Sequence, residues 1–211
     1  MHSCPLCFCE SQRFCQDDTR EYQQCRNCKL VFVPEAFHLT AEEEKAQYDL
    51  HENSPDDNAY RAFLSRLYLP MLELLPKNSL GLDFGSGPGP TLSIMFEEAG
   101  HRMALFDIFY AQDKTVLTRC YDFITATEVV EHLARPADIF TRLWGILKPG
   151  GWLGIMTKRV QNRAAFAHWH YKNDPTHIAF YSNATFCWLA DELGAELYLM
   201  APDVVLMRKA A

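Results

Sequence analysis

Four cysteines near the start of the chain have the spacing of metal ligands. Cys4 and Cys7 form one CxxC pair, and Cys25 and Cys28 form a second. Two residues between ligands let one tight turn point both thiolates at a single ion, and two such turns complete a tetrahedral site. We therefore predict a structural Zn²⁺ ion held by Cys4, Cys7, Cys25 and Cys28. Free thiols or a redox pair are the alternative interpretation.

A glycine-rich turn lies in the stretch LGLDFGSGPGP, residues 80–90. An apolar run is followed there by a GxGxG pattern that contains Gly85, Gly87 and Gly89. Such a turn between a strand and a helix lets the backbone approach a nucleotide closely. A dinucleotide loop would have a third glycine where Pro90 stands, so a different nucleotide is expected. A tight turn that binds nothing is the alternative.

Two acidic residues accompany this turn. Asp83 stands two residues before the first glycine, and Asp107 ends the next predicted strand. A carboxylate at the end of that strand can accept hydrogen bonds from both hydroxyls of a ribose. The alternative for Asp107 is a carboxylate that caps a helix.

Taken together, four segments resemble the class I S-adenosylmethionine-dependent methyltransferases. They are LDFGSGPG, Asp107, YDFITATEVVEHLARP and LKPGGWLGIMT. The CxxC pairs and HWHYKNDPTHIAFYS resemble a narrower bacterial group that carries a zinc ribbon ahead of the catalytic domain. The resemblance covers about residues 79–211 and implies S-adenosylmethionine as the cofactor.

The resemblance also implies roles for single residues. Gly85, Ser86, Gly87 and Gly89 would approach the methionine end of the cofactor, and Asp83 would organise their loop. Asp107 would hold the ribose. Thr127 and Glu128 would lie where the fourth strand opens on the sulfonium.

Two further contacts to the cofactor are expected from position along the chain. We place the adenine contacts within residues 108–113, beginning with Ile108. Tyr48, His51 and Asn53 are polar residues on a segment that leads into the nucleotide-binding core, and Tyr48 is the candidate we assign to the cofactor site. Ordinary surface residues are the alternative.

Methyl transfer to a carbon, oxygen or nitrogen atom can require removal of a proton. Histidine and glutamate are suitable bases near neutral pH. The candidates are Glu128, His132, His170 and His177. Glu131 and His132 have a second interpretation as the start of the next helix, and the two later histidines have one as members of a structural loop.

Strands and helices that would position these residues alternate from residue 79 onward. Apolar runs predict strands at 80–84, 101–107, 121–127 and 150–157, with two antiparallel strands within 195–209. Helices are predicted at 91–100, 137–148 and 182–194. This alternation predicts an α/β fold with a doubly wound, mostly parallel sheet, Rossmann-like and of methyltransferase type.

Only residues 108–120 separate Asp107 from the next strand, too few for a helix and a strand. The third strand is therefore absent or abbreviated to residues 115–117. We divide the chain into a zinc ribbon (1–34), a helical linker or cap (35–78) and a methyltransferase domain (79–211). In the linker, Thr40 and Glu43 form a capping box, and Pro70 predicts a kink or break.

Charge and hydropathy limit the partners. The net charge of -7 makes nucleic acid an unlikely partner and favours a small-molecule acceptor. An RNA-modifying methyltransferase and a non-catalytic interaction module remain as alternatives. The first residues lack a signal-peptide pattern and no window approaches 18 apolar residues, so we expect a cytoplasmic protein without a membrane span.

Overall fold

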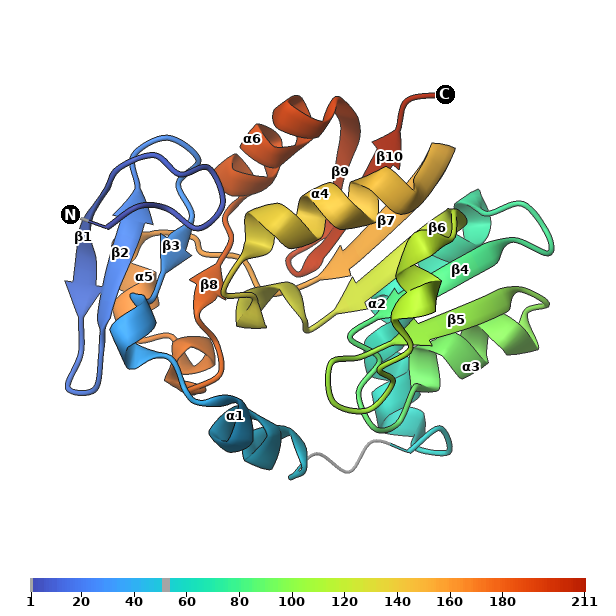
Figure 1. Ribbon diagram of the computed structural model, residues 1–211, viewed down its shortest axis with the longest axis horizontal. Helices are drawn as coiled ribbons and strands as arrows, with labels where there is room; N and C mark the ends of the chain where they lie inside the picture. The colour runs from blue at the N-terminus through green and yellow to red at the C-terminus, as the bar shows by residue number, and fades with distance from the viewer. Residues whose placement is uncertain (1, 51–53) are drawn as a thin grey trace.

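The computed structural model describes residues 2–50 and 54–211, and two β-sheets organise that part of the chain (Figure 1). The larger sheet has the strand order β5-β4-β6-β7-β10-β9, and the smaller has the order β1-β2-β3-β8. The strands of the larger sheet are β4 (Leu80–Phe84), β5 (Arg102–Phe106), β6 (Tyr121–Thr127), β7 (Leu147–Met156), β9 (Ala195–Ala201) and β10 (Val204–Lys209).

The larger sheet is mostly parallel, as predicted. Strands β5, β4, β6 and β7 run parallel, while β10 pairs antiparallel with both β7 and β9. The shortened third-strand region is confirmed: its residues form the 3-10 helix η2 (Lys114–Thr118), and β5 is left at the edge of the sheet.

Helices cover both faces of this sheet (Figure 1). Phe123 and Trp152 belong to a buried cluster under α2 (Asn58–Leu74) and α3 (Thr91–Glu98). Their neighbours Ile124 and Leu153 belong to a second cluster under α4 (Pro136–Ile146) and α6 (Asn183–Leu193). Successive residues of a strand point to opposite faces, so this alternation is what a doubly wound sheet requires.

Two helix starts follow the sequence, but the predicted helix at 137–148 ends early, because Leu147 and Lys148 already belong to β7. Thr40 and Glu43 form the predicted capping box at α1 (Ala41–Tyr48), and Ser182 caps α6. Pro70, however, does not break α2, which continues to Leu74. Proline removes one helix hydrogen bond, but Leu64, Leu67 and Met71 are buried against the sheet along the same helix, and this packing holds it together.

The smaller sheet joins the N-terminal residues to a segment that follows β7. Strands β1 (Ser11–Gln16), β2 (Glu21–Cys25) and β3 (Val31–Phe32) are antiparallel, and β8 (Ala179–Phe180) pairs with β3. Tyr22, Phe166 and Phe180 pack edge to face beneath it, with Tyr22 and Phe166 ring centroids 5.0 Å apart. The segment around β8 is therefore held against the N-terminal residues.

Short helices complete the loops. They are η1 (Glu35–Phe37), η3 (Val130–His132), α5 (Arg163–Ala167) and η4 (His170–Asn173). Within residues 2–50 and 54–211, no helix combines the length and apolarity that crossing a membrane requires.

Candidate active site

The glycine loop after β4 is a tight turn, and its backbone conformation favours glycine at two positions. Gly85 and Gly87 have φ angles of +77° and +64°. A Cβ atom on Gly85 would lie 2.3 Å from a methyl group of Val129. The N–H of Gly85 donates to the carbonyl oxygen of Phe106 at 2.7 Å, which fastens the loop to the end of β5. Close approach of a ligand to the loop backbone follows from this geometry.

Asp107 connects this loop to the next one. Its Oδ2 accepts a hydrogen bond from the N–H of Gly87 at 3.0 Å. Its Oδ1 accepts from the N–H groups of Phe109 and Tyr110 at 2.8 and 3.1 Å. Each carboxylate oxygen has two lone pairs, so Oδ1 is fully used and Oδ2 can accept one further hydrogen bond from a ligand hydroxyl.

Asp83 lies beneath the loop and is almost completely buried. It accepts hydrogen bonds from Ser93 at 3.0 Å and from Thr125 at 2.8 Å, and so ties β4 to α3 and β6. Burial raises its pKa to about 6, against the two hydroxyl bonds that favour the charged form.

A cavity of about 910 Å³ opens over the carboxyl ends of β4, β5 and β6, and we call it the main cavity. The residues assigned singly to the cofactor all line it: Tyr48, Asp83, Gly85, Ser86, Gly87, Gly89, Asp107, Ile108, Thr127 and Glu128. Of the range 108–113 predicted to contact the adenine, residues 111–113 do not line it. His51 and Asn53, which we consider beside Tyr48, lie outside the described residues.

Sequence reasoning missed the apolar walls of the main cavity. Tyr60 and Phe63 of α2 stack with ring centroids 6.1 Å apart on one side. Leu117 also lines the cavity, together with Phe109, which belongs to the predicted range 108–113. The helical spacing in α2 indicated packing on the core, and no pattern in the sequence distinguishes a residue that covers a sheet from one that reaches past its end.

The candidate bases separate into two groups. Glu128, His132 and His177 line the main cavity. His170 is exposed, does not line the cavity, and places Nε2 3.2 Å from Nζ of Lys158. His170 therefore lies outside this cavity, because η4 directs the next residue, Tyr171, inward and His170 to solvent.

Glu128 occupies a strained position at the end of β6. Its φ angle is +51°, and its N–H donates to Met156 at 2.7 Å. Burial raises the pKa of its carboxyl to about 8, and the neighbouring Glu131 adds to the shift. Among the described residues, nothing forms a hydrogen bond with its Oε1 atom. A strained backbone conformation, together with a buried carboxylate oxygen that forms no hydrogen bond, is typical of a functional position.

Glu131, His132 and His177 form a second group beside Glu128, which we call the Glu131 cluster. One carboxylate oxygen and one ring nitrogen from each histidine lie within 4.8 Å of one another. The two imidazole rings meet edge to face with centroids 4.7 Å apart. The interpretation of Glu131 as only a helix start does not account for its burial, since its side chain is 0% exposed.

Tyr48 packs against this cluster from α1. Its ring meets that of His132 at 5.3 Å and that of Phe109 at 5.8 Å, and its hydroxyl donates to Glu44 at 2.7 Å. The α1 segment thus forms part of the wall of the main cavity, between Phe109 and the Glu131 cluster.

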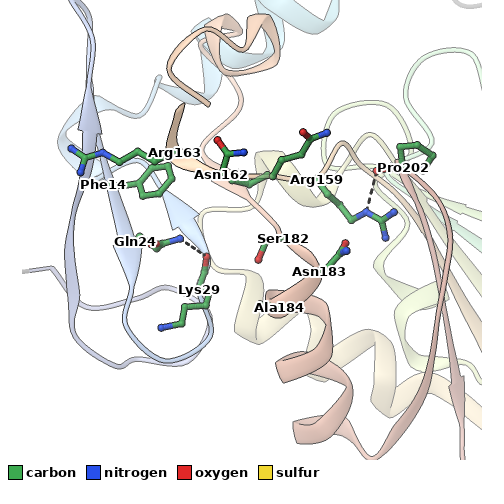
Figure 2. A pocket seen from close by; sticks show the side chains of 12 residues that line it. Phe14, Gln24, Lys29, Arg159, Asn162, Arg163, Ser182, Asn183, Ala184 and Pro202 are labelled. Atoms are coloured by element: carbon green, nitrogen blue, oxygen red, sulfur yellow. Dashed lines mark hydrogen bonds between the residues drawn. The ribbon is translucent and has the colours of Figure 1, made fainter. Parts of the chain in front are cut away.

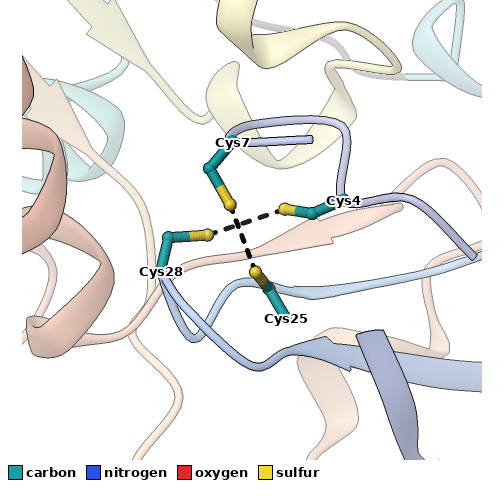
Figure 3. A group of neighbouring side chains, drawn as sticks. All are labelled: Cys4, Cys7, Cys25 and Cys28. Atoms are coloured by element: carbon teal, nitrogen blue, oxygen red, sulfur yellow. Dashed lines mark hydrogen bonds between the residues drawn. The ribbon is translucent and has the colours of Figure 1, made fainter. Parts of the chain in front are cut away.

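The four N-terminal cysteines converge on one point (Figure 3). The Sγ atoms of Cys4 and Cys28 lie 3.6 Å apart, and those of Cys7 and Cys25 lie 3.2 Å apart. Backbone N–H groups of the two knuckles point at Sγ of Cys4 and of Cys25, each at 3.4 Å. This cluster lies apart from the main cavity, whose lining includes none of the four.

A second cavity, of about 650 Å³, lies between the smaller sheet and the start of α6 (Figure 2). Its lining includes Lys29, Arg163 and Arg159, and the last of these donates to Pro202 at 3.0 Å. None of the predicted site residues lines it. The candidate active site is therefore the main cavity.

Comparison with known proteins identifies the family of the chain and its fold. The family model described as "Methyltransferase domain" matches residues 57–199. The chain is similar to a SAM-dependent methyltransferase from Archaeoglobus fulgidus, at 15% identity over 71% of this chain and 94% of that one, with a TM-score of 0.53. No curated protein matches the sequence.

Two further solved structures share the fold. The 1,6-didemethyltoxoflavin-N1-methyltransferase of Burkholderia thailandensis is 14% identical over 88% of this chain and 98% of that one, with a TM-score of 0.52. An O-methyltransferase family protein from the same organism is 16% identical over 88% of this chain and 65% of that one, with a TM-score of 0.50.

Proposed function

Because the chain belongs to the methyltransferase-domain family, whose model matches residues 57–199, we propose that this S-adenosylmethionine-dependent methyltransferase transfers the methyl group to a small molecule held in the main cavity. One observation carries the proposal: a single cavity is lined both by the glycine loop with Asp107 and by Glu128, His132 and His177. Cofactor and acceptor can therefore meet in one enclosed space.

The chain offers groups that fit the cofactor. The buried hydroxyl of Ser86 has no hydrogen-bond partner among the described residues, and a Cβ atom on Gly87 would meet nothing within 4 Å. We assign the methionine end to this loop and one ribose hydroxyl to Oδ2 of Asp107, which accepts a single backbone hydrogen bond. We assign the adenine to the wall formed by Ile108, Phe109 and Leu117.

The cofactor supplies an activated methyl group with its own leaving group, so the protein mainly aligns the acceptor and excludes water. Glu128 lies at the end of β6, where we place the sulfonium. A positive charge beside its carboxyl would favour the ionised form and oppose the burial that raises its pKa. In the absence of a bound metal ion, Nε2 of His132 or His177 would take a proton from the acceptor.

The volume and the charge of the cavity favour a small acceptor over a nucleic acid. Its volume lies within the usual range of ligand pockets, about 300–1,000 Å³. Six acidic residues line it against three basic ones. The acidic residues are Glu44, Asp83, Asp107, Glu128, Asp138 and Asp174, and the basic ones are Lys114, Arg135 and Arg142. A phosphate backbone would be repelled by this balance and by the net charge of -7.

We also propose that the four cysteines hold a structural Zn²⁺ ion. Tetrahedral zinc with bonds of about 2.3 Å to sulfur places the sulfur atoms about 3.8 Å apart. The observed separations of 3.6 and 3.2 Å are close to that value. The N–H groups directed at Cys4 and Cys25 would stabilise thiolates.

Calorimetric titration with S-adenosylmethionine and S-adenosylhomocysteine tests the function. We expect binding by the native protein and a loss of at least tenfold in affinity in Asp107→Ala. Asp191→Ala, at an exposed position on α6, is the matched control. No binding by folded native protein would contradict the proposal. RNA binding that weakens steeply with salt would contradict the small-molecule acceptor alone.

A further inference from the structure

The Glu131 cluster has the composition of a metal site. It brings one carboxylate and two imidazoles together from two distant segments, η3 and the loop before β8. Two histidines and one carboxylate are a ligand set of catalytic Zn²⁺ and of Fe²⁺ sites, which keep further coordination positions open.

Hydrogen bonds on the far sides of the rings determine which nitrogen each histidine presents. Nδ1 of His132 lies 3.1 Å from the carbonyl oxygen of Thr176, and Nδ1 of His177 lies 2.7 Å from that of Tyr171. A carbonyl oxygen can only accept, so in the neutral ring the proton is on Nδ1. Nε2 then carries a lone pair in both residues, and this is the orientation that ligating histidines adopt.

Glu131 supplies a buried carboxyl group without a matching cation. Its side chain is 0% exposed, and one oxygen accepts a hydrogen bond from the hydroxyl of Tyr171. Within residues 2–50 and 54–211, no hydrogen bond reaches Oε2, and no Lys or Arg forms an ion pair with this carboxylate. An uncompensated buried carboxylate is costly, and a bound cation would supply the missing partner.

Asp174 adds a second carboxylate at the same place. Its Oδ2 lies 3.7 Å from Nε2 of His177, while its Oδ1 accepts from the N–H and hydroxyl of Thr176. Two carboxylates and two imidazole lone pairs thus gather around one small space. His132, His177 and Asp174 line the main cavity, so this space faces the acceptor.

We propose that Glu131, Nε2 of His132 and Nε2 of His177 bind one divalent first-row transition-metal ion, which holds an acceptor carrying two adjacent oxygen atoms. This rests on the proposed function, because the main cavity must hold the acceptor. Ligands on one ion at about 2.1 Å lie at most about 4.2 Å apart. One ligand atom of each of the three residues already lies within 4.8 Å of the others, so a small adjustment of the side chains would reach that geometry.

The ion gives the methyl acceptor its reactivity. Binding to a divalent cation lowers the pKa of a hydroxyl, as it does for metal-bound water. The acceptor hydroxyl loses its proton to water at the cavity mouth. An O–C bond to the methyl carbon then forms as the S–C bond breaks, and its electron pair stays on sulfur. The second oxygen of the acceptor fills another open position of the ion and orients the first.

The test uses the full chain loaded with one equivalent of zinc, so that the cysteines are filled. Co²⁺ is then titrated and followed by calorimetry and visible absorbance. We expect one further ion per chain, without the charge-transfer bands of thiolate ligands, and at least tenfold weaker binding in His177→Gln and Glu131→Gln. His170→Gln is the matched control, because that histidine is exposed and lies outside the cavity.

Catechol and phenol then test the acceptor class. We expect catechol to bind the Co²⁺-loaded protein at least tenfold more tightly than the Co²⁺-free protein, and phenol to show no such difference. Equal effects for the two would overturn the two-oxygen acceptor. Failure to bind Co²⁺, or binding unchanged in His177→Gln, would overturn the metal site.

Titration of the same samples with S-adenosylhomocysteine separates this inference from the proposed function. Binding of S-adenosylhomocysteine without binding of Co²⁺ would leave the methyltransferase intact and make the histidines metal-free bases, which overturns the inference.

Discussion

The N–H of Gly87 donates a hydrogen bond of 3.0 Å to Oδ2 of Asp107. The acid at the end of β5 therefore holds the loop that follows β4. Its other oxygen orders the backbone of Phe109 and Tyr110. One side chain thus couples the segment that we assign to the methionine end of the cofactor with the segment that we assign to the adenine.

This coupling predicts that Asp107→Asn impairs cofactor binding although the side chain keeps its size. The amide would replace one acceptor oxygen with a donor that faces backbone N–H groups. We expect S-adenosylhomocysteine to bind at least tenfold more weakly, about 1.4 kcal/mol, by calorimetry. Asp113→Asn is the control, since Asp113 accepts a comparable backbone bond from Thr115 at 2.9 Å outside the cavity lining. Equal affinities in the two variants would contradict the prediction.

Gly85→Ala should destabilise the protein. The φ angle of +77° is unfavourable for alanine, and the new Cβ would lie 2.3 Å from Val129. We expect a loss of about 1–3 kcal/mol in the free energy of unfolding, measured by urea denaturation. Gly145→Ala in α4 is the control: a Cβ there meets nothing within 4 Å, and alanine favours a helix. Its stability should be equal or higher, and a comparable loss in both would argue against a local cause.

The ion pair between Asp17 and Lys172 connects the end of the β1 segment to η4. We predict that its contribution to the free energy of unfolding depends on pH. Their charged groups lie 2.5 Å apart, and Lys172 is buried. Partial burial alone would raise the pKa of Asp17, but the bonds from Lys172, Thr19 and Arg20 outweigh it and hold that pKa well below its usual range.

A carboxyl whose pKa is lowered by folding stabilises the protein above its unfolded pKa, about 3.9. That contribution is lost as the pH falls from there through the folded pKa. Asp17→Asn should therefore cost about 1–3 kcal/mol at pH 7, and the difference from native protein should shrink below pH 4. Urea unfolding at both pH values measures it, with the exposed neighbour in Asp18→Asn as control. A pH-independent difference would exclude the ion pair as its cause.

Removal of a cysteine ligand should release metal and loosen the smaller sheet. Cys4→Ser leaves three thiolates, so we expect the loss of one zinc equivalent per chain by metal analysis. The melting temperature should fall as well, because metal binding contributes folding energy. Cys120→Ser, at an exposed position, should change neither. Full zinc retention in Cys4→Ser would show that this residue is not a ligand.

Much of the fold and of the cofactor site could be predicted from residue order, because those features are local. The GxGxG turn, Asp107 at a strand end and the capping box of Thr40 each depend on neighbours a few residues away. The two CxxC pairs are also local turns. Their spacing alone indicates that the four thiolates can share one ion.

Other features could be determined only from the tertiary structure. Pro70 stays inside α2 because buried neighbours hold the helix. His170 and His177 share one segment, yet η4 exposes the first and the following turn directs the second toward His132. The burial of Glu131 likewise depends on Tyr171. Spacing along the chain determines what a turn or a helix presents locally, whereas contacts between distant segments depend on how the sheet, its helices and the N-terminal strands pack together.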